Sequence, residues 1–233
     1  MPAPIPYRGL VEHPDLGLCS YRLTQVSDDP DTQVSQVIDF MRGYANEDAR
    51  SPIIKNDCAM ARSVGTGDPL QDTWNYLSRR AGYRGMQFQR DEVTAAPCDL
   101  DRWNPIVETL IRPCDQALLP RPVGDCDDFA QYGAAHLICN SVPCSYATIA
   151  ADPEYPRMFS HVYLVAYPKV GPYAGMRVPM DLSHGHHLGW EHGEIFRIAE
   201  WPLGTSLSSL IGYGALGVCA YLLYKAIKKG GLN

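Results

Sequence analysis

The sequence predicts an α+β fold in which one central helix packs against a small antiparallel sheet. Three observations support this expectation. Apolar residues up to about position 140 recur at helical spacing, short segments after position 143 have the composition of strands, and turns rich in proline and glycine separate those segments. A set of helices followed by consecutive strands is typical of an α+β layer fold.

We expect three regions along the 233 residues. Residues 1–31 are rich in Pro, Asp and Gly and are predicted to be irregular, apart from one short strand at 19–26. Residues 32–203 are long enough to form a single domain around one core. Residues 204–233 differ in character, because a long uncharged stretch is followed there by a basic tail.

The predicted helices rest on apolar spacing and on residues that favour helix ends. A first helix begins at a cap on Asp31 or Thr32, and its apolar face is Val34, Val37, Ile38, Met41 and Ala45. A second begins at Asp68 and Pro69 and ends at Gly82. A third is predicted over 103–111, ended by Pro113, with loops over 46–66 and 118–124.

The central helix is predicted over residues 126–140. Its apolar face includes the small residues Ala130, Gly133 and Ala134, which indicate close packing against a sheet. Four segments after it, separated by turns rich in proline and glycine, are predicted to be strands, at 144–151, 161–167, 177–182 and 194–199.

Three residues in this part of the chain suggest nucleophilic catalysis. Cys126 lies where the loop Gly124-Asp125 turns into the central helix, His161 opens a strand, and Asp181 closes another. A thiol, an imidazole and a carboxylate can serve as nucleophile, general base and the group that orients the base. A helix N-terminus favours a thiolate, and the backbone amide of Cys126 is a natural oxyanion donor.

Two features of this site stay open at the level of sequence. Asp125, Asp127 and Asp128 oppose a thiolate at Cys126, so at least one of them is expected to cap the helix or to bind another partner. A second oxyanion donor is also needed, and Gln116 and Trp103 are the candidates.

The motifs Gly124-Asp125-Cys126-Asp127-Asp128-Phe129-Ala130, Ser160-His161-Val162-Tyr163 and Val178-Pro179-Met180-Asp181 resemble those of the transglutaminase-like superfamily of cysteine hydrolases and acyltransferases. Within it, the chain is similar to small members encoded by phages and prophages. The resemblance spans residues 70–200.

The resemblance implies a papain-like core with Cys126 as nucleophile, His161 as base and Asp181 as third member. It also implies thiol-dependent amide hydrolysis or acyl transfer, with peptide bonds in proteins or peptidoglycan as substrates and other virion proteins as partners. No cofactor is expected. The alternative is a non-catalytic minor virion or membrane protein built on the same fold, because the superfamily includes inactive structural members.

A histidine-rich segment leaves a metal alternative open. His184, His186, His187 and His192 lie close to Glu191 and Glu194, and imidazoles at this density can bind zinc. Their spacing fits no closed structural zinc site, so we expect a substrate-facing or solvated loop and no metal ligand.

Charge and cysteine usage limit the partners and the compartment. The net charge is −6 and no basic stripe precedes the C-terminus, so no nucleic-acid partner is expected. The eight cysteines form no C-x-x-C pair, and the opening residues lack the pattern of a signal peptide. We therefore expect reduced thiols in a chain made without a signal peptide.

The C-terminal segment predicts a membrane anchor over residues 207–227. Residues 207–224 carry no charge, and a helix of about 18–21 residues spans about 27–31 Å, close to a bilayer core. Lysines flank its C-terminal end at Lys225, Lys228 and Lys229. The expected location is a phage particle or host envelope, and a buried helix of a larger assembly is the alternative.

Overall fold

A four-stranded antiparallel sheet forms one layer of the protein. The computed structural model describes residues 6–13, 17–25, 29–79, 82–90 and 107–203. The sheet has the order β8-β7-β6-β9, and every pair within it is antiparallel. Its strands are β6 (Cys144–Ala150), β7 (His161–Ala166), β8 (Val178–Met180) and β9 (Arg197–Leu203).

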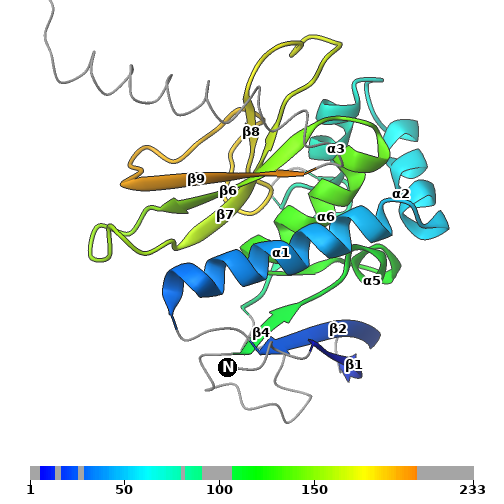
Figure 1. Cartoon of the computed structure of the whole chain (residues 1–233). Coiled ribbons are helices and arrows are strands. Elements are labelled where there is room, and N and C mark those ends of the chain that lie inside the picture. The colour runs from blue at the N-terminus through cyan, green and yellow to red at the C-terminus, as the bar shows by residue number, and fades with distance from the viewer. Residues whose placement is uncertain (1–5, 14–16, 26–28, 80–81, 91–106, 204–233) are drawn as a thin grey trace, which may run out of the picture. The chain divides into compact units, whose positions relative to one another are not determined.

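Helices form the second layer, as Figure 1 shows. The predicted α+β class with an antiparallel sheet is therefore confirmed. Four of the helices begin with a proline in the first turn, where a missing N–H costs nothing. The helices are α1 (Pro30–Asp48), α2 (Pro52–Ser63), α3 (Pro69–Leu77), α5 (Pro113–Leu118) and α6 (Cys126–Cys139).

The first region of the chain is a hairpin, which corrects the prediction of an irregular segment at 1–31. Strands β1 (Pro6–His13) and β2 (Gly17–Gln25) pair antiparallel, and β2 also pairs with β4 (Val107–Leu110). The strand predicted at 19–26 corresponds to β2. The partner β1 escaped prediction because prolines and glycine interrupt its apolar pattern.

Other predictions of helix bounds were also wrong. Helix α1 is capped by Asp29 and not by Asp31 or Thr32, and α3 ends at Leu77 and not at Gly82.

Residues 46–66 were expected to be a loop, yet α2 lies within them, capped by the Ser51 hydroxyl, which accepts from the Ile54 amide. Residues 107–110 belong to strand β4 and not to a helix over 103–111, because pairing with β2 overrides the local pattern. Pro113 starts α5 and does not end a helix.

Helix α6 lies at the centre of the domain, in contact with α1, α2, α3, α5 and strand β7. Its bounds agree with the predicted 126–140, and Gly133 explains how it approaches the sheet. A Cβ at this position would lie 2.6 Å from Leu182 Cδ1 and 2.7 Å from Leu164 Cδ1. Only glycine therefore fits between the helix and strand β7 without moving those side chains.

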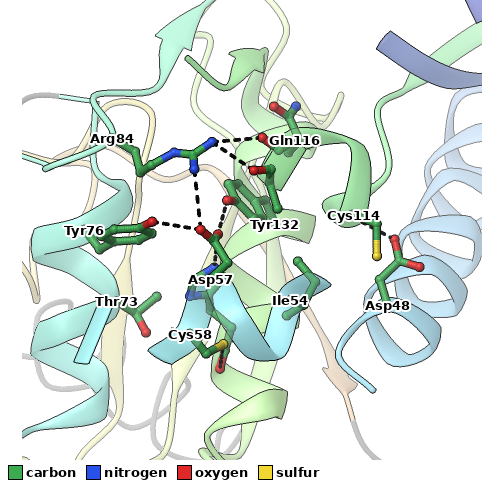
Figure 2. A network of polar contacts seen from close by, with 12 residues as sticks. Asp48, Ile54, Asp57, Cys58, Thr73, Tyr76, Arg84, Cys114, Gln116 and Tyr132 are labelled. Atoms are coloured by element: carbon green, nitrogen blue, oxygen red, sulfur yellow. Dashed lines mark hydrogen bonds and ion pairs between the residues drawn. The ribbon is translucent and has the colours of Figure 1, made fainter. Parts of the chain in front are cut away.

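A buried carboxylate fixes α6 to the other helices, as Figure 2 shows. Asp57 of α2 accepts hydrogen bonds from the hydroxyls of Tyr76 in α3 and Tyr132 in α6, and it contacts His136 Nε2 at 2.9 Å. Arg84 lies 3.5 Å from the same carboxylate and donates to the Leu119 carbonyl. A buried charge needs such partners, so the network ties three helices and two loops to one point.

Burial by itself raises the pKa of the Asp57 carboxyl, but the hydrogen bond and charge of His136, together with both tyrosines, outweigh it. The pKa of Asp57 is therefore lowered, and the group stays ionised in the folded protein at neutral pH.

Among the described residues, no helix is long and apolar enough to cross a membrane. The anchor predicted at 207–227 lies outside those residues. By internal contacts the chain divides into two units, Met1–Leu203 and Gly204–Asn233.

A pair of glycine variants tests the close approach of α6 to the sheet. Gly133→Ala should lower the free energy of unfolding by about 1–3 kcal/mol, because its methyl group overpacks the contact with Leu164 and Leu182. Gly43→Ala, on the exposed face of α1 with open space around it, should raise that free energy by about 0.5–1 kcal/mol. Urea denaturation measures both, and equal effects would contradict the predicted contact.

Candidate functional site

The loop that leads into Cys126 is held by hydrogen bonds from both sides. Residues 87–88 form β3 (Gln87–Phe88), which pairs in parallel with β5 (Val123–Gly124). Gly124 has a φ of 152°, and a Cβ there would lie 2.2 Å from Asp128 Oδ2. A glycine is required at this position, which gives the Gly-Asp-Cys motif a structural reason.

Gln116 supports the same loop and is not an oxyanion donor. Its side chain is fully buried, its Oε1 accepts from the Val123 amide at 3.0 Å, and its Nε2 donates to the Val123 carbonyl. The side-chain amide is thus used by the loop, which corrects one of the two predictions for the second donor. The other candidate, Trp103, lies outside the described residues.

Cys126 is the first residue of α6 and is half-buried against the core. Asp125 caps the helix, since its side chain accepts from the Asp127 amide at 3.3 Å. Asp128 is buried and accepts from the Ile111 amide at 2.7 Å. Two of the three carboxylates that oppose a thiolate are therefore bound to backbone amides, as the sequence led us to expect.

His161 and Asp181 form a buried pair. The imidazole Nε2 lies 2.8 Å from Asp181 Oδ2, and the side chain of Asp181 is fully buried. Because a carboxylate can only accept, Nε2 carries the proton and the neutral ring keeps its lone pair on Nδ1. The predicted base and its orienting group thus meet, with the tautomer fixed by the hydrogen bond.

The second oxygen of Asp181 is held by the turn that follows it. Oδ1 accepts from the Ser183 amide at 3.1 Å, from the Ser183 hydroxyl at 2.9 Å and from the His184 amide at 2.8 Å. Burial by itself raises the pKa of Asp181, but the bond from His161, the nearby His192 imidazole and the His184 amide outweigh it and hold the pKa well below its usual range.

Two further histidines converge on this pair, which the sequence analysis missed. The ring centroids of His184 and His192 lie 4.7 Å and 5.1 Å from that of His161. His192 Nε2 lies 3.6 Å from Asp181 Oδ2. Burial and the charge of His161 lower the pKa of His184. The available signal was the close spacing of Asp181, His184 and His192 in one loop, which the sequence analysis treated as separate from the His161–Asp181 pair.

The remaining histidines of that loop point elsewhere. The ring of His186 packs on Trp190, with centroids 5.2 Å apart, and His187 is exposed, with its Nδ1 3.0 Å from the Leu188 carbonyl. Glu191 accepts from the Tyr163 hydroxyl and pairs with Arg177. The histidine-rich segment is therefore not a unit, because only two of its imidazoles join the buried pair.

Cys126 and His161 lie toward the same end of the domain. Helix α6 and strand β7 run in the same direction, because their C-terminal ends meet at one turn. In that turn the Val142 amide donates to the Leu137 carbonyl, and the Tyr167 amide at the end of β7 donates to the Pro143 carbonyl. Gly133 of α6 lies against Leu164 of β7. Cys126 precedes Gly133 by seven residues, which is about 10 Å along the helix at 1.5 Å per residue. His161 is three residues back along β7, also about 10 Å.

A chain of ring contacts connects His161 with the first turn of α6, which begins at Cys126. His184 packs on His161 and on Phe88, with centroids 5.7 Å apart in the second pair, and Phe88 packs on Phe129 at 6.5 Å. Phe129 lies one turn after Cys126 in α6. The structure thus joins His161 and Asp181 directly, and contact of the Cys126 thiol with His161 stays a prediction.

Comparison of the chain with protein-family models, with curated proteins and with solved structures finds no match.

The lowered pKa of Asp181 predicts a pH-dependent stability. A carboxyl whose pKa is lower in the folded than in the unfolded protein stabilises the fold above the unfolded pKa, and this contribution is lost as the pH falls toward the folded pKa. Between about pH 5 and pH 2 the wild type should therefore lose of the order of 2 kcal/mol more than Asp181→Asn. Ser183→Ala should lie between them, since Oδ1 loses one donor. Urea denaturation at each pH gives the slopes, and identical slopes would show that Asp181 is not held in this way.

Proposed function

We propose that the protein is a thiol-dependent amide hydrolase or acyltransferase, in which Cys126 is the nucleophile, His161 the base and Asp181 the orienting group. The supporting observation is the buried His161–Asp181 hydrogen bond, located toward the same end of the domain as the first turn of α6. A buried carboxylate that holds one imidazole nitrogen fixes the tautomer and the orientation that a general base needs.

The hydrogen bond defines the role of each imidazole nitrogen. With Nε2–H directed at Asp181, Nδ1 accepts the thiol proton, and the thiolate Sγ attacks the amide carbonyl carbon. The carbonyl electron pair moves onto oxygen, where the backbone N–H of Cys126 at the helix start donates to it. Collapse breaks the C–N bond, the imidazolium gives its proton to the departing amine, and water or a second amine resolves the thioester.

The fold we propose for this site is a papain- and transglutaminase-like core. A helix that begins with the nucleophile and packs on an antiparallel sheet carrying the base and the orienting group supports it. The proposed substrates are peptide bonds in proteins or peptidoglycan, and the proposed setting is a phage particle or host envelope. The motif resemblance supports both, and the −6 net charge argues against nucleic acid.

We also propose that residues 207–227 anchor the protein to a membrane, on the basis of their uncharged length and flanking lysines. A chain ending at Leu203 should then move from the membrane fraction to the soluble fraction after lysis, while the full chain stays with membranes after a high-salt wash. A full chain that is extracted by salt alone would contradict the anchor.

Turnover of a peptide pool, with hydroxylamine added to capture the thioester as a hydroxamate, tests the proposed chemistry. Cys126→Ala and His161→Ala should lower the rate at least about a thousandfold, and Asp181→Asn about a hundredfold or more. Cys139→Ala, a half-buried cysteine at the other end of α6, is the matched control and should keep the wild-type rate.

The assay is run with a strong chelator present. Activity that survives Cys126→Ala, or that disappears on addition of the chelator, would contradict thiol catalysis.

A further inference from the structure

Asp181 and three nearby histidines, His161, His184 and His192, are of the residue types that bind transition-metal ions. One nitrogen or oxygen atom from each of His161, Asp181 and His184 lies within 4.8 Å of the others. His192 Nε2 lies 3.6 Å from Asp181 Oδ2, which is too long for a hydrogen bond. That nitrogen is buried and has no hydrogen-bond partner in the described part of the chain.

The three imidazoles lie close to one another. Their ring centroids are separated by 4.7 Å, 5.1 Å and 6.1 Å, and all three pairs are edge-on or tilted, not stacked. Two imidazoles on one tetrahedral zinc, with Zn–N bonds of about 2.0–2.1 Å, place their centroids about 5 Å apart. The two pairs that include His161 are close to that spacing, and the His184–His192 pair is about 1 Å wider, so His192 would move toward His184 to complete the shell.

Hydrogen bonds to other groups already occupy His184 Nδ1 and Asp181 Oδ1, which leaves His184 Nε2 and Asp181 Oδ2 as the ligand atoms. The Ser183 hydroxyl donates to Asp181 Oδ1 and accepts from His184 Nδ1 at 2.9 Å, which leaves the lone pair of His184 on Nε2. Backbone amides hold Asp181 Oδ1, so Oδ2 is the oxygen that faces the histidines. Such partners orient the ligands of metal sites in proteins.

We propose that His161, Asp181, His184 and His192 bind one divalent transition-metal ion of the zinc type. Imidazole nitrogens with one carboxylate oxygen suit Zn²⁺ or Co²⁺, whereas Ca²⁺ and Mg²⁺ prefer shells made of oxygen. The ion would bind Nε2 of His161 in place of the proton now shared with Asp181.

This metal site has a consequence that rests on the proposed thiol function. When Nε2 of His161 binds a metal, the neutral ring carries its proton on Nδ1, and that nitrogen can no longer accept a proton from Cys126. The metal-bound protein is therefore inactive as a thiol enzyme, and the ion acts as an inhibitor that competes for the base.

Zinc binding to the full-length Cys126→Ala protein, measured by competition with a chromogenic chelator, tests the site apart from any thiol chemistry. We expect one equivalent of tightly bound zinc and a tetrahedral Co²⁺ absorption spectrum. His192→Ala should weaken zinc binding at least about a hundredfold, and Ser183→Ala about tenfold or more. The double variant His186→Ala and His187→Ala removes two exposed imidazoles of the same loop and should bind as tightly as its parent.

The two proposals fail differently. Absence of tight zinc binding, or loss of binding in the His186/His187 double variant with retention in His192→Ala, overturns the metal site and leaves the thiol function standing. If circular dichroism shows that His192→Ala is unfolded, the zinc affinity of Ser183→Ala and the Co²⁺ spectrum test the metal site instead. Unchanged affinity in Ser183→Ala together with a Co²⁺ spectrum that is not tetrahedral overturns it. In the active wild type, the zinc concentration for half-inhibition should equal the dissociation constant of the Cys126→Ala protein. Wild type that stays fully active at saturating zinc contradicts competition for the base.

Discussion

The carboxylate of Asp181 is the group on which the rest of the site depends. It is fully buried, and among the described residues the hydrogen bonds that offset the cost of burying its charge come from side chains and amides of the site. One oxygen is held by the turn at Ser183 and His184, and the other faces His161 and His192. The carboxylate therefore sets the tautomer of the imidazole and the position of the ring together.

A second buried carboxylate, Asp57, has a comparable role at the other side of α6. Its contacts with Tyr132 and His136 fix the helix that begins with Cys126, and Tyr76 and Arg84 connect that helix to α3 and to the following loop. The absence of a side chain at Gly133 then sets the distance between α6 and β7. The thiol and the imidazole are thus positioned by two separate polar networks joined through one close helix–sheet contact.

Prediction from sequence succeeded where local chemistry decides structure. The Asp68-Pro69 start of α3, the Cys126 start of α6 and the strand-type composition of β6 and β7 are local signals, and the structure follows them. The prediction failed at strand β4, because β4 pairs with residues of β2 that lie more than 80 positions away, and no local pattern encodes such a pairing.

The candidate site shows the same division. The pairing of His161 with Asp181 followed from the motifs, whereas the convergence of His184 and His192 depends on how the loop after β8 packs against the start of β7. The role of Gln116 was misjudged for a related reason. Its amide could bind a substrate oxygen or the backbone of its own loop, and only the fold shows that Val123 takes both of its polar atoms.

The central claim is that the Cys126 thiol lies within reach of an imidazole held by Asp181, and the rate of its alkylation measures this most directly. With a chelator present at pH 7, iodoacetamide should modify Cys126 at least about tenfold faster than the half-buried Cys114 and Cys139, as mapped by mass spectrometry of timed samples. His161→Ala should remove that difference. Modification of Cys126 at the rate of the other cysteines, unchanged by His161→Ala, would contradict the account.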